Sequence, residues 1–184
     1  FRRVLFRSAE VELAERSLRP DAQASSAEAA RLAAEEKGLA RLLAAADGDL
    51  WPPLIDAVTV AAGFAKALGA ALGDDLSASA DQGAPAHWDT LPPLDDAPAL
   101  PPGARALSDF VQAPPALSRR LGQIGVVDEA DGARLQPALG PGQRLVSASG
   151  ALWRWDGYTV RAGAATPAAT RLEQRARLAE IQAA

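Results

Sequence analysis

Both ends of this 184-residue chain favour helices, and its middle does not. Residues 9–46 and the segment after residue 166 consist mainly of Ala, Leu, Glu and Arg, which are strong helix formers or tolerate helices well. Residues 51–165 hold most of the Gly and Pro, which interrupt helices and mark turns. The chain is therefore constrained to enter a small central domain on one helix and to leave it on another.

Each terminal helix carries a narrow apolar seam. In the first, Leu32, Leu39 and Leu43 recur at steps of seven and four, so they share one face. The second has a matching seam of small and apolar residues: Leu172, Ala176, Ala179 and Ala183. Because a narrow seam suits a two-helix coiled coil better than a globular core, we expect the two helices to pair with each other, antiparallel.

Local signals predict where these helices begin and break. Pro20 is expected to interrupt the first helix, and Ser25 with Glu28 has the spacing of a capping box that restarts it. Thr166 followed by Pro167 is typical of an N-cap and first helical residue, and predicts the start of the second helix.

The central segment interleaves predicted strands and helices. Helices are expected over 63–73 and 114–125, and a Pro-rich loop over 77–106. Short apolar runs bounded by turn residues predict strands over 54–60, 107–112, 125–129, 143–149 and 151–160. This order indicates an α+β (mixed α/β) domain.

We expect four parts along the chain. Residues 1–8, FRRVLFRS, look like a translated sequencing-adapter oligonucleotide, so we expect them to be an artefact. Residues 9–49 form the first arm, 50–163 the central domain and 164–184 the returning arm. Because the chain contains no Met, we also expect it to be a piece of a longer protein.

Composition excludes several classes of protein. The chain has no Cys, which rules out disulfides and thiol chemistry and removes the usual zinc ligands. The formal net charge of −4 argues against a protein that coats nucleic acid, which needs many cations. No apolar run approaches the roughly 20 residues of a membrane span, so we expect no membrane partner.

The sequence offers no pattern for catalysis or cofactor binding. It has neither a phosphate-cradling P-loop nor a dinucleotide-binding Gly-rich motif. His87 is the only His, and the adjacent acid pairs at 74–75 and 95–96 are typical of solvated turns. We therefore predict no catalytic, cofactor-binding or metal-binding residue, and no enzymatic activity in this segment.

Aromatic residues gather in the segment 151–160, ALWRWDGYTV, which holds two of the four Trp and the single Tyr. Strand alternation places Trp153 and Trp155 on one face and Arg154 on the other. Packing in a core or an interface is favoured by the general preference of aromatic residues for such positions. A stacking platform for nucleic-acid bases is the alternative.

Arginine supplies almost all of the positive charge beyond residue 8. These side chains balance charge on a solvated surface, or form a local patch that contacts DNA phosphates without reading bases. Weak, non-specific DNA contact is predicted for Arg119, Arg120, Arg144, Arg154, Arg161 and Arg171.

Four segments together resemble a known domain: LIDAVTVAAGFAKALGAALGDDL, APAHWDTLPPLDDAPALP, QAPPALSRRLGQIGVVD and PGQRLVSASGALWRWDGYTV. In order and spacing they are similar to the hinge of bacterial structural-maintenance-of-chromosomes (SMC) proteins, and most similar to the alphaproteobacterial subtype. The likeness covers roughly residues 51–160, and the flanking helices look like the adjoining coiled-coil arms. One departure is the Pro-rich stretch 89–102, which stands where the family has a Gly-Arg-containing segment.

The resemblance implies a homodimerisation hinge of a cytoplasmic, nucleoid-associated ATPase that condenses and segregates chromosomes. ATP, Mg²⁺ and kleisin-type partners would bind heads that lie outside this segment. The family joins two hinges through strands and Gly-rich turns, since Gly permits positive φ and close backbone approach. This implies a dimer interface at Gly140, Gly142, Gly150, Trp153, Trp155 and Gly157.

Two further classes remain open. The chain could be the tip domain of a coiled-coil hairpin adaptor protein, which would bring a signal or anchor and paired lipoyl-like β motifs that we do not find. It could also be a small-molecule-binding domain without a recognisable motif.

Overall fold

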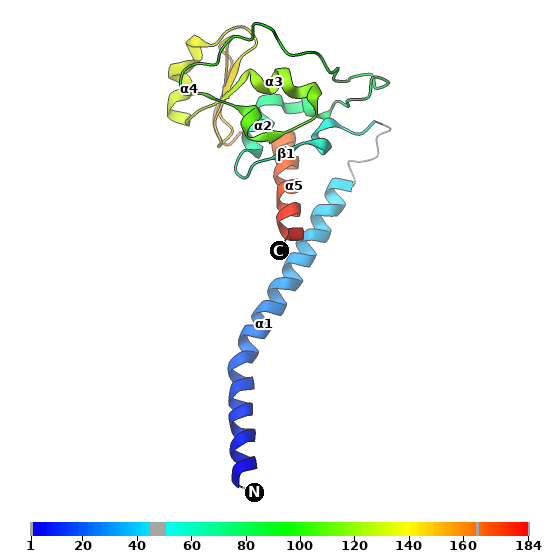
Figure 1. Ribbon diagram of the computed structural model, residues 1–184, viewed down its shortest axis with the longest axis vertical. Coiled ribbons are helices and arrows are strands. Elements are labelled where there is room, and N and C mark those ends of the chain that lie inside the picture. The colour runs from blue at the N-terminus through cyan, green and yellow to red at the C-terminus, as the bar shows by residue number, and fades with distance from the viewer. Residues whose placement is uncertain (1, 45–50, 165, 184) are drawn as a thin grey trace.

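Two helices form a rod that carries a rounded domain at one end (Figure 1). The computed structural model describes residues 2–44, 51–164 and 166–183, with side chains between 2 and 44 described for 19–42. Helix α1, Arg2–Ala44, rises toward the domain, and helix α5, Pro167–Ala183, descends from it beside α1. The predicted antiparallel direction is confirmed. The predicted domain limits at 9, 50 and 164 stay predictions.

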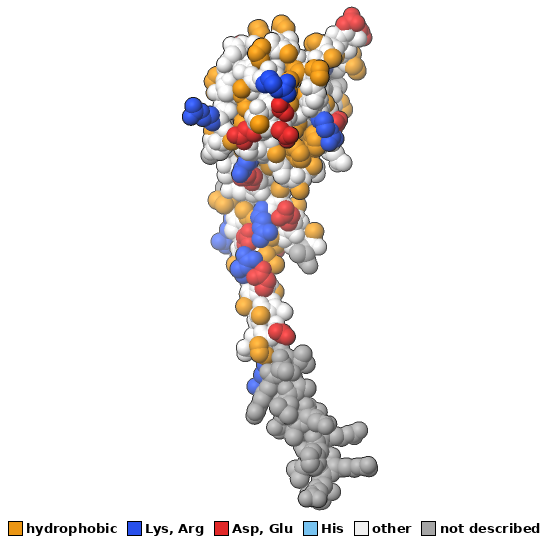
Figure 2. All heavy atoms as spheres, turned by 90° about the vertical axis from the view of Figure 1, so that its left-hand side faces the viewer, with side chains coloured by type: hydrophobic (Ala, Val, Ile, Leu, Met, Phe, Trp, Pro, Cys, Tyr) orange, Lys and Arg blue, Asp and Glu red, His pale blue; other side chains and the backbone are white. Residues whose placement is uncertain are grey.

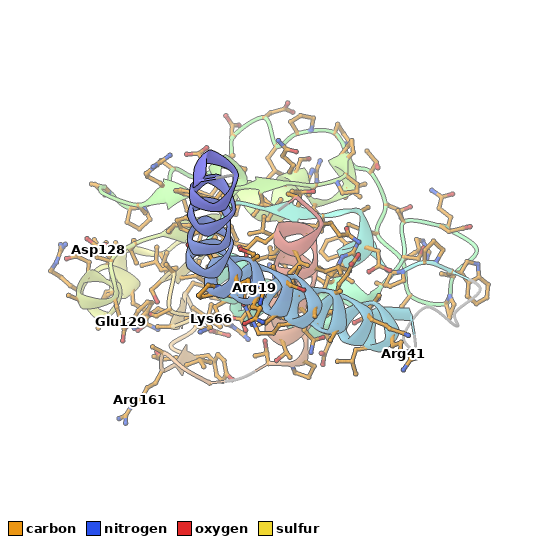
Figure 3. All side chains as sticks on the ribbon, turned by 90° about the horizontal axis from the view of Figure 1, so that it is seen from below. Arg19, Arg41, Lys66, Asp128, Glu129 and Arg161 are labelled. Carbon is orange, nitrogen blue, oxygen red and sulfur yellow. The ribbon has the colours of Figure 1, made fainter. Side chains whose placement is uncertain are left out.

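Helix α1 is continuous, and the predicted interruption is wrong. Pro20 lies inside the helix, and Figure 3 shows α1 changing direction near the labelled Arg19, as expected beside a proline. Ser25 and Glu28 are interior helical residues, so they form no N-terminal cap. Glu28 instead pairs with Arg31 one turn on, at 2.6 Å.

The domain consists of short elements. Its helices are α2 (Ala65–Leu72), α3 (Ser118–Gly122) and α4 (Glu129–Leu135). Its strands are β1 (Thr59–Val60), β2 (Arg105–Ala106), β3 (Val111–Gln112), β4 (Ile124–Val126), β5 (Arg144–Val146), β6 (Leu152–Arg154) and β7 (Thr159–Val160). Turns of 3₁₀ helix cover Leu54–Ala57, Gly73–Ser77, Leu107–Asp109, Pro115–Leu117 and Gln136–Ala138.

The main sheet is mixed, with strand order β2-β4-β5-β6-β7. Strands β4 and β5 are parallel, and the other neighbours are antiparallel. A separate antiparallel pair joins β1 to β3. The α+β class predicted from the sequence is confirmed.

Two of the predicted strands begin as 3₁₀ turns. In 54–60 and 107–112 only the last residues, Thr59–Val60 and Val111–Gln112, are extended. Leu54 and Ile55 are both buried, whereas a strand would send neighbouring side chains to opposite faces. The turn lets both enter the same core, with the Leu54 amide donating to the Ala78 carbonyl at 2.9 Å.

The main sheet separates two hydrophobic cores, because alternate residues of its strands face opposite sides. Ile124, Val146 and Leu152 face the larger core, which includes residues of α2, α3 and α5. Leu145 and Trp153 face the smaller core beneath α4. In Figure 1, α4 lies on one side of the strands and α2 and α3 lie on the other.

The first turns of α5 belong to the domain. Ala168, Ala169 and Leu172 are buried, and Leu172 lies in the larger core. A Cβ on Gly69 of α2 would come within 2.5 Å of the Ala169 backbone, so only glycine allows this approach. The Thr166 hydroxyl accepts a hydrogen bond from the Ala169 amide at 3.1 Å, which confirms the predicted N-cap.

The predicted seam between the two arms is therefore partly wrong. Leu172 packs into the domain, because α5 starts as part of the core. The orientation of α5 that buries Leu172 leaves Ala176, Ala179 and Ala183 exposed. On α1, Leu32 and Leu39 are half-buried, and the side chain of Leu43 lies outside the described residues.

Polar contacts hold α5 to α1 farther along the rod. The Arg177 guanidinium donates to Glu35 at 2.7 Å, and the Gln182 amide donates to Glu36 at 3.2 Å. The hydrogen bond from Arg177, reinforced by its charge, lowers the pKa of Glu35 below 4.5. These contacts between the arms are polar and electrostatic.

Replacing Gly69 by Ala should destabilise the domain by about 1–3 kcal/mol, because the new methyl must push α5 away from α2. Urea unfolding followed by circular dichroism measures this. Gly38→Ala is the matched control, since its Cβ meets nothing within 4 Å, and it should be neutral or slightly stabilising. Equal stability of the Gly69 variant and wild type would contradict the packing.

Glu35→Gln should weaken the contact between α1 and α5, because it removes the charged partner of Arg177. Lowering the pH should have the same effect, because it protonates Glu35. Since the pKa of Glu35 is lowered in the folded chain, its contribution is fully present above pH 4.5 and is lost as the pH falls through the lowered value. Spin labels at the exposed residues Lys37 and Ala183 report the separation by electron paramagnetic resonance, and the distance distribution should broaden. Asp131→Asn, which removes an ion pair with Arg134 on α4, should leave the distance unchanged.

Candidate functional site

The hairpin that joins β6 to β7 exposes two large aromatic side chains. Trp155 is 48% exposed and Tyr158 is 55% exposed. The turn is closed by the Gly157 amide, which donates to the Arg154 carbonyl at 3.1 Å, and Gly157 has a φ of +90° that favours glycine. Strand β7 pairs only with β6 among the described residues, so its outer edge is free. We call residues 154–160 the aromatic hairpin.

The two tryptophans of this region have different roles. Trp153 is 7% exposed and packs beneath α4, where a Cβ on Gly132 would lie 2.4 Å from its ring. Strand β6 ends at Arg154, so Trp155 starts the turn and lies at the surface. Trp153 therefore belongs to the core of the chain itself, and Trp155 is available for contacts outside it.

The glycines predicted for the dimer interface differ in their exposure. Gly142 and Gly157 have positive φ, and both are exposed. Gly140 is half-buried and its amide donates to the Gln143 side chain at 2.9 Å. Gly150 has a φ of +88° and is buried, and a Cβ at this position would lie 3.3 Å from the Cβ of Lys66.

Of the predicted interface residues, Gly142, Trp155 and Gly157 are thus the surface set. Their contact with a second copy stays a prediction.

The six arginines predicted to contact DNA do not form one patch. Arg119 donates to the Pro92 carbonyl and tethers the loop before β2. Arg171 contacts Asp56 at 3.0 Å, together with Arg175. Arg161 is exposed and points away from the domain in Figure 3.

The other three arginines lie together, and we call them the arginine cluster. Arg144 begins β5 and faces Arg154, the last residue of β6, in the strand register. Arg120 comes from α3, and its charge acts on Arg144. The antiparallel pairing of β5 with β6 places Arg144 opposite Arg154. The parallel pairing of β4 with β5 brings α3, which precedes β4 and carries Arg120, close to Arg144.

Each member of the arginine cluster has a partner within the chain. Arg144 donates to the Ala71 carbonyl at the C-terminal end of α2, where a cation is favoured by the helix dipole. Arg120 lies 3.8 Å from the Asp75 carboxylate. Arg154 donates to Asp156 at 3.1 Å and lies 5.2 Å above the centre of the Tyr158 ring.

Burial and mutual repulsion shape the electrostatics of the cluster. Burial lowers the pKa of Arg144 to about 10, and the charges of Arg120 and Arg154 act in the same direction. Burial also lowers the pKa of Arg120, against the effect of Asp75. The Nε atoms of Arg120 and Arg144 are buried without an acceptor among the described residues.

An apolar groove of about 360 Å³ lies beside the cluster, between α3 and the Pro-rich loop. Arg120 lies at its wall, and Gly142 at its rim. Its apolar lining comes from Trp88, Leu91, Leu94, Pro98 and Ala116.

On the face shown in Figure 2, positive and negative side chains lie close to one another, over the domain and along the described part of the rod. Within the described ranges, no three His, Asp or Glu side chains gather where they could hold a metal ion. None of the described helices is long and apolar enough to cross a membrane.

Comparisons with known proteins agree on one family. The chain is 50% identical over 152 residues to the chromosome partition protein Smc of Rhodopseudomonas palustris, covering 83% of this chain and 13% of that protein. It is 50% identical over 133 residues to the Smc protein of Cereibacter sphaeroides, covering 70% of this chain and 11% of that protein. The chain thus spans about an eighth of the length of these relatives. No protein-family model matches it.

The fold leads to the same family. A solved dimer of the Geobacillus stearothermophilus SMC hinge domain superposes with a TM-score of 0.61 at 19% identity, covering 98% of this chain and 89% of that one. At this identity the likeness concerns the fold. The sequence relatives supply the family, and the solved hinge supplies the fold, a central domain between two antiparallel arms: the chain belongs to the SMC proteins and has the fold of their hinge with adjoining helical arms.

Proposed function

We propose that this chain joins two copies of a chromosome-organising SMC protein through its hinge. The observation that carries the proposal is the aromatic hairpin, where Trp155 and Tyr158 are exposed beside the free edge of β7. An uncovered strand edge invites pairing with another chain, and a two-fold interface covers both edges with one self-complementary surface. The solved hinge of similar fold is described as an asymmetric dimer, which supports the proposal.

The proposal extends to the whole protein. Its curated relatives are named chromosome partition proteins, and this chain corresponds to a small part of them. In the whole protein, heads outside this segment would bind ATP, Mg²⁺ and kleisin-type partners, and the arms would link heads to hinge. The contribution of this segment is structural: it joins two chains in the cytoplasm, at the nucleoid.

If the aromatic hairpin is the dimer interface, the Trp155→Ala, Tyr158→Ala double variant should weaken dimerisation by about tenfold or more, because buried aromatic anchors dominate interface energy. Sedimentation over a concentration series measures the mass of the wild type and the variant. Circular dichroism checks that the variant is folded.

Leu42→Ala is the control, since Leu42 is 60% exposed but lies on the arm, away from the hairpin. It should not change the mass. A wild type that stays monomeric at high concentration would refute the hinge proposal. A folded double variant that is still fully dimeric would place the interface elsewhere.

Weak contact with single-stranded DNA is a second candidate, favoured by one observation. The aromatic hairpin and the residue after β7 present Trp155, Tyr158 and Arg161 at the surface. Exposed aromatic rings with nearby cations bind bases by stacking and phosphates by charge. The acidic total of the chain does not oppose a local contact of this kind.

Trp155→Ala should weaken binding of an oligothymidylate by about tenfold, the size of one lost stacking contact. Arg161→Gln should reduce the salt dependence by about one counterion. Fluorescence anisotropy over a salt series measures both. Arg134→Gln is the matched control, because Arg134 is also exposed but is paired with Asp131 on α4. Binding that is insensitive to salt would eliminate this candidate.

A further inference from the structure

The arginine cluster contains a pairing that a sheet normally avoids. Arg144 and Arg154 lie directly opposite each other on adjacent antiparallel strands. Like charges in this position destabilise a sheet unless a counter-charge lies between them. A third guanidinium, that of Arg120, acts on the same region from α3.

The described residues supply too little negative charge to balance the cluster. The carboxylates paired with it are Asp75, 3.8 Å from Arg120, and Asp156, which pairs with Arg154. Arg144 donates to an uncharged group, the Ala71 carbonyl. Three positive charges thus face two negative ones, and the Asp75 side chain is 55% exposed, so solvent screens its effect.

Two donor groups in the cluster also lack a hydrogen-bond acceptor among the described residues. The Nε atoms of Arg120 and Arg144 are buried and have no acceptor among the described residues. A buried donor without a partner is costly, so such groups in a native protein call for an acceptor. A guanidinium presents its donors in a planar fork that matches the oxygens of a phosphate.

The cluster is reachable from outside. The Arg154 side chain is 37% exposed, and Arg120 forms part of the wall of the apolar groove beneath the Pro-rich loop. An anion can therefore reach Arg120 from the groove and Arg154 from the side of the aromatic hairpin.

From this geometry we infer that Arg120, Arg144 and Arg154 form a binding site for a phosphate group. The burial and the repulsion that lower the pKa of Arg144 both disfavour its positive charge, and a bound dianion would offset them. Arg154 is the first residue of the aromatic hairpin, whereas Arg120 and Arg144 lie outside it. Phosphate binding by these guanidinium groups uses neither the backbone edge of β7 nor the ring of Trp155.

Titration of inorganic phosphate into the full chain tests the site. The ionic strength is kept constant with chloride, and heat is recorded by isothermal titration calorimetry. The wild type should bind phosphate saturably with one site per chain. Arg120→Gln and Arg154→Gln should each weaken binding about tenfold, the effect of one charge-assisted hydrogen bond. Circular dichroism checks that both variants fold, and Arg144 is left in place because it holds the end of α2.

Two further variants sharpen the test. Asp75→Asn should tighten phosphate binding, because it removes a carboxylate that competes for Arg120. Arg134→Gln removes an exposed, paired arginine elsewhere and should change nothing. Phosphate binding that does not saturate, or that is as strong in both cluster variants as in the wild type, would overturn the site.

Competition identifies the source of the phosphate. If a short oligothymidylate displaces phosphate from the wild type and from Trp155→Ala alike, the site takes phosphates of a nucleic-acid backbone. If it does not, the site takes free phosphate or a small phosphate ester. Both results support the site, and neither depends on the mass measured for the dimer.

Discussion

The close contact between α2 and the start of α5 is the constraint on which the rest of the structure depends. Gly69 lets the Ala169 backbone approach α2 more closely than any side chain would allow, and Leu172 then enters the larger core. Since α5 is part of the domain before it becomes part of the rod, the direction of the returning arm is fixed by packing. The paired contacts of Asp56 with Arg171 and Arg175 reinforce that direction.

Packing also supports the base of the aromatic hairpin. Strand β6 lies between two cores, with Leu152 in the larger one and Trp153 in the smaller one, so it is held on both faces. The turn that follows is presented from a fixed base. This arrangement suits the proposed dimer, in which the orientation of one arm would be passed to a surface shared with a second copy.

Charge acts locally in this protein. The chain is acidic overall, yet Arg120, Arg144 and Arg154 converge where the ends of β5, β6 and α3 meet. Other arginines are engaged in tethering or in ion pairs: Arg119 holds the Pro-rich loop, and Arg177 holds the two arms together. The role of each arginine depends on its neighbours in the fold, so the sequence alone does not predict that role.

The sequence by itself determined the helical ends, the mixed central domain, the N-cap at Thr166 and the SMC family, because local propensity and motif order carry that information. Only the tertiary structure decided which face of α5 is buried, and that Trp153 is core while Trp155 is exposed. The reason is physical. Burial, strand ends and the convergence of distant arginines depend on how elements pack and pair, and contacts between residues far apart in the chain leave no periodic signal in the sequence.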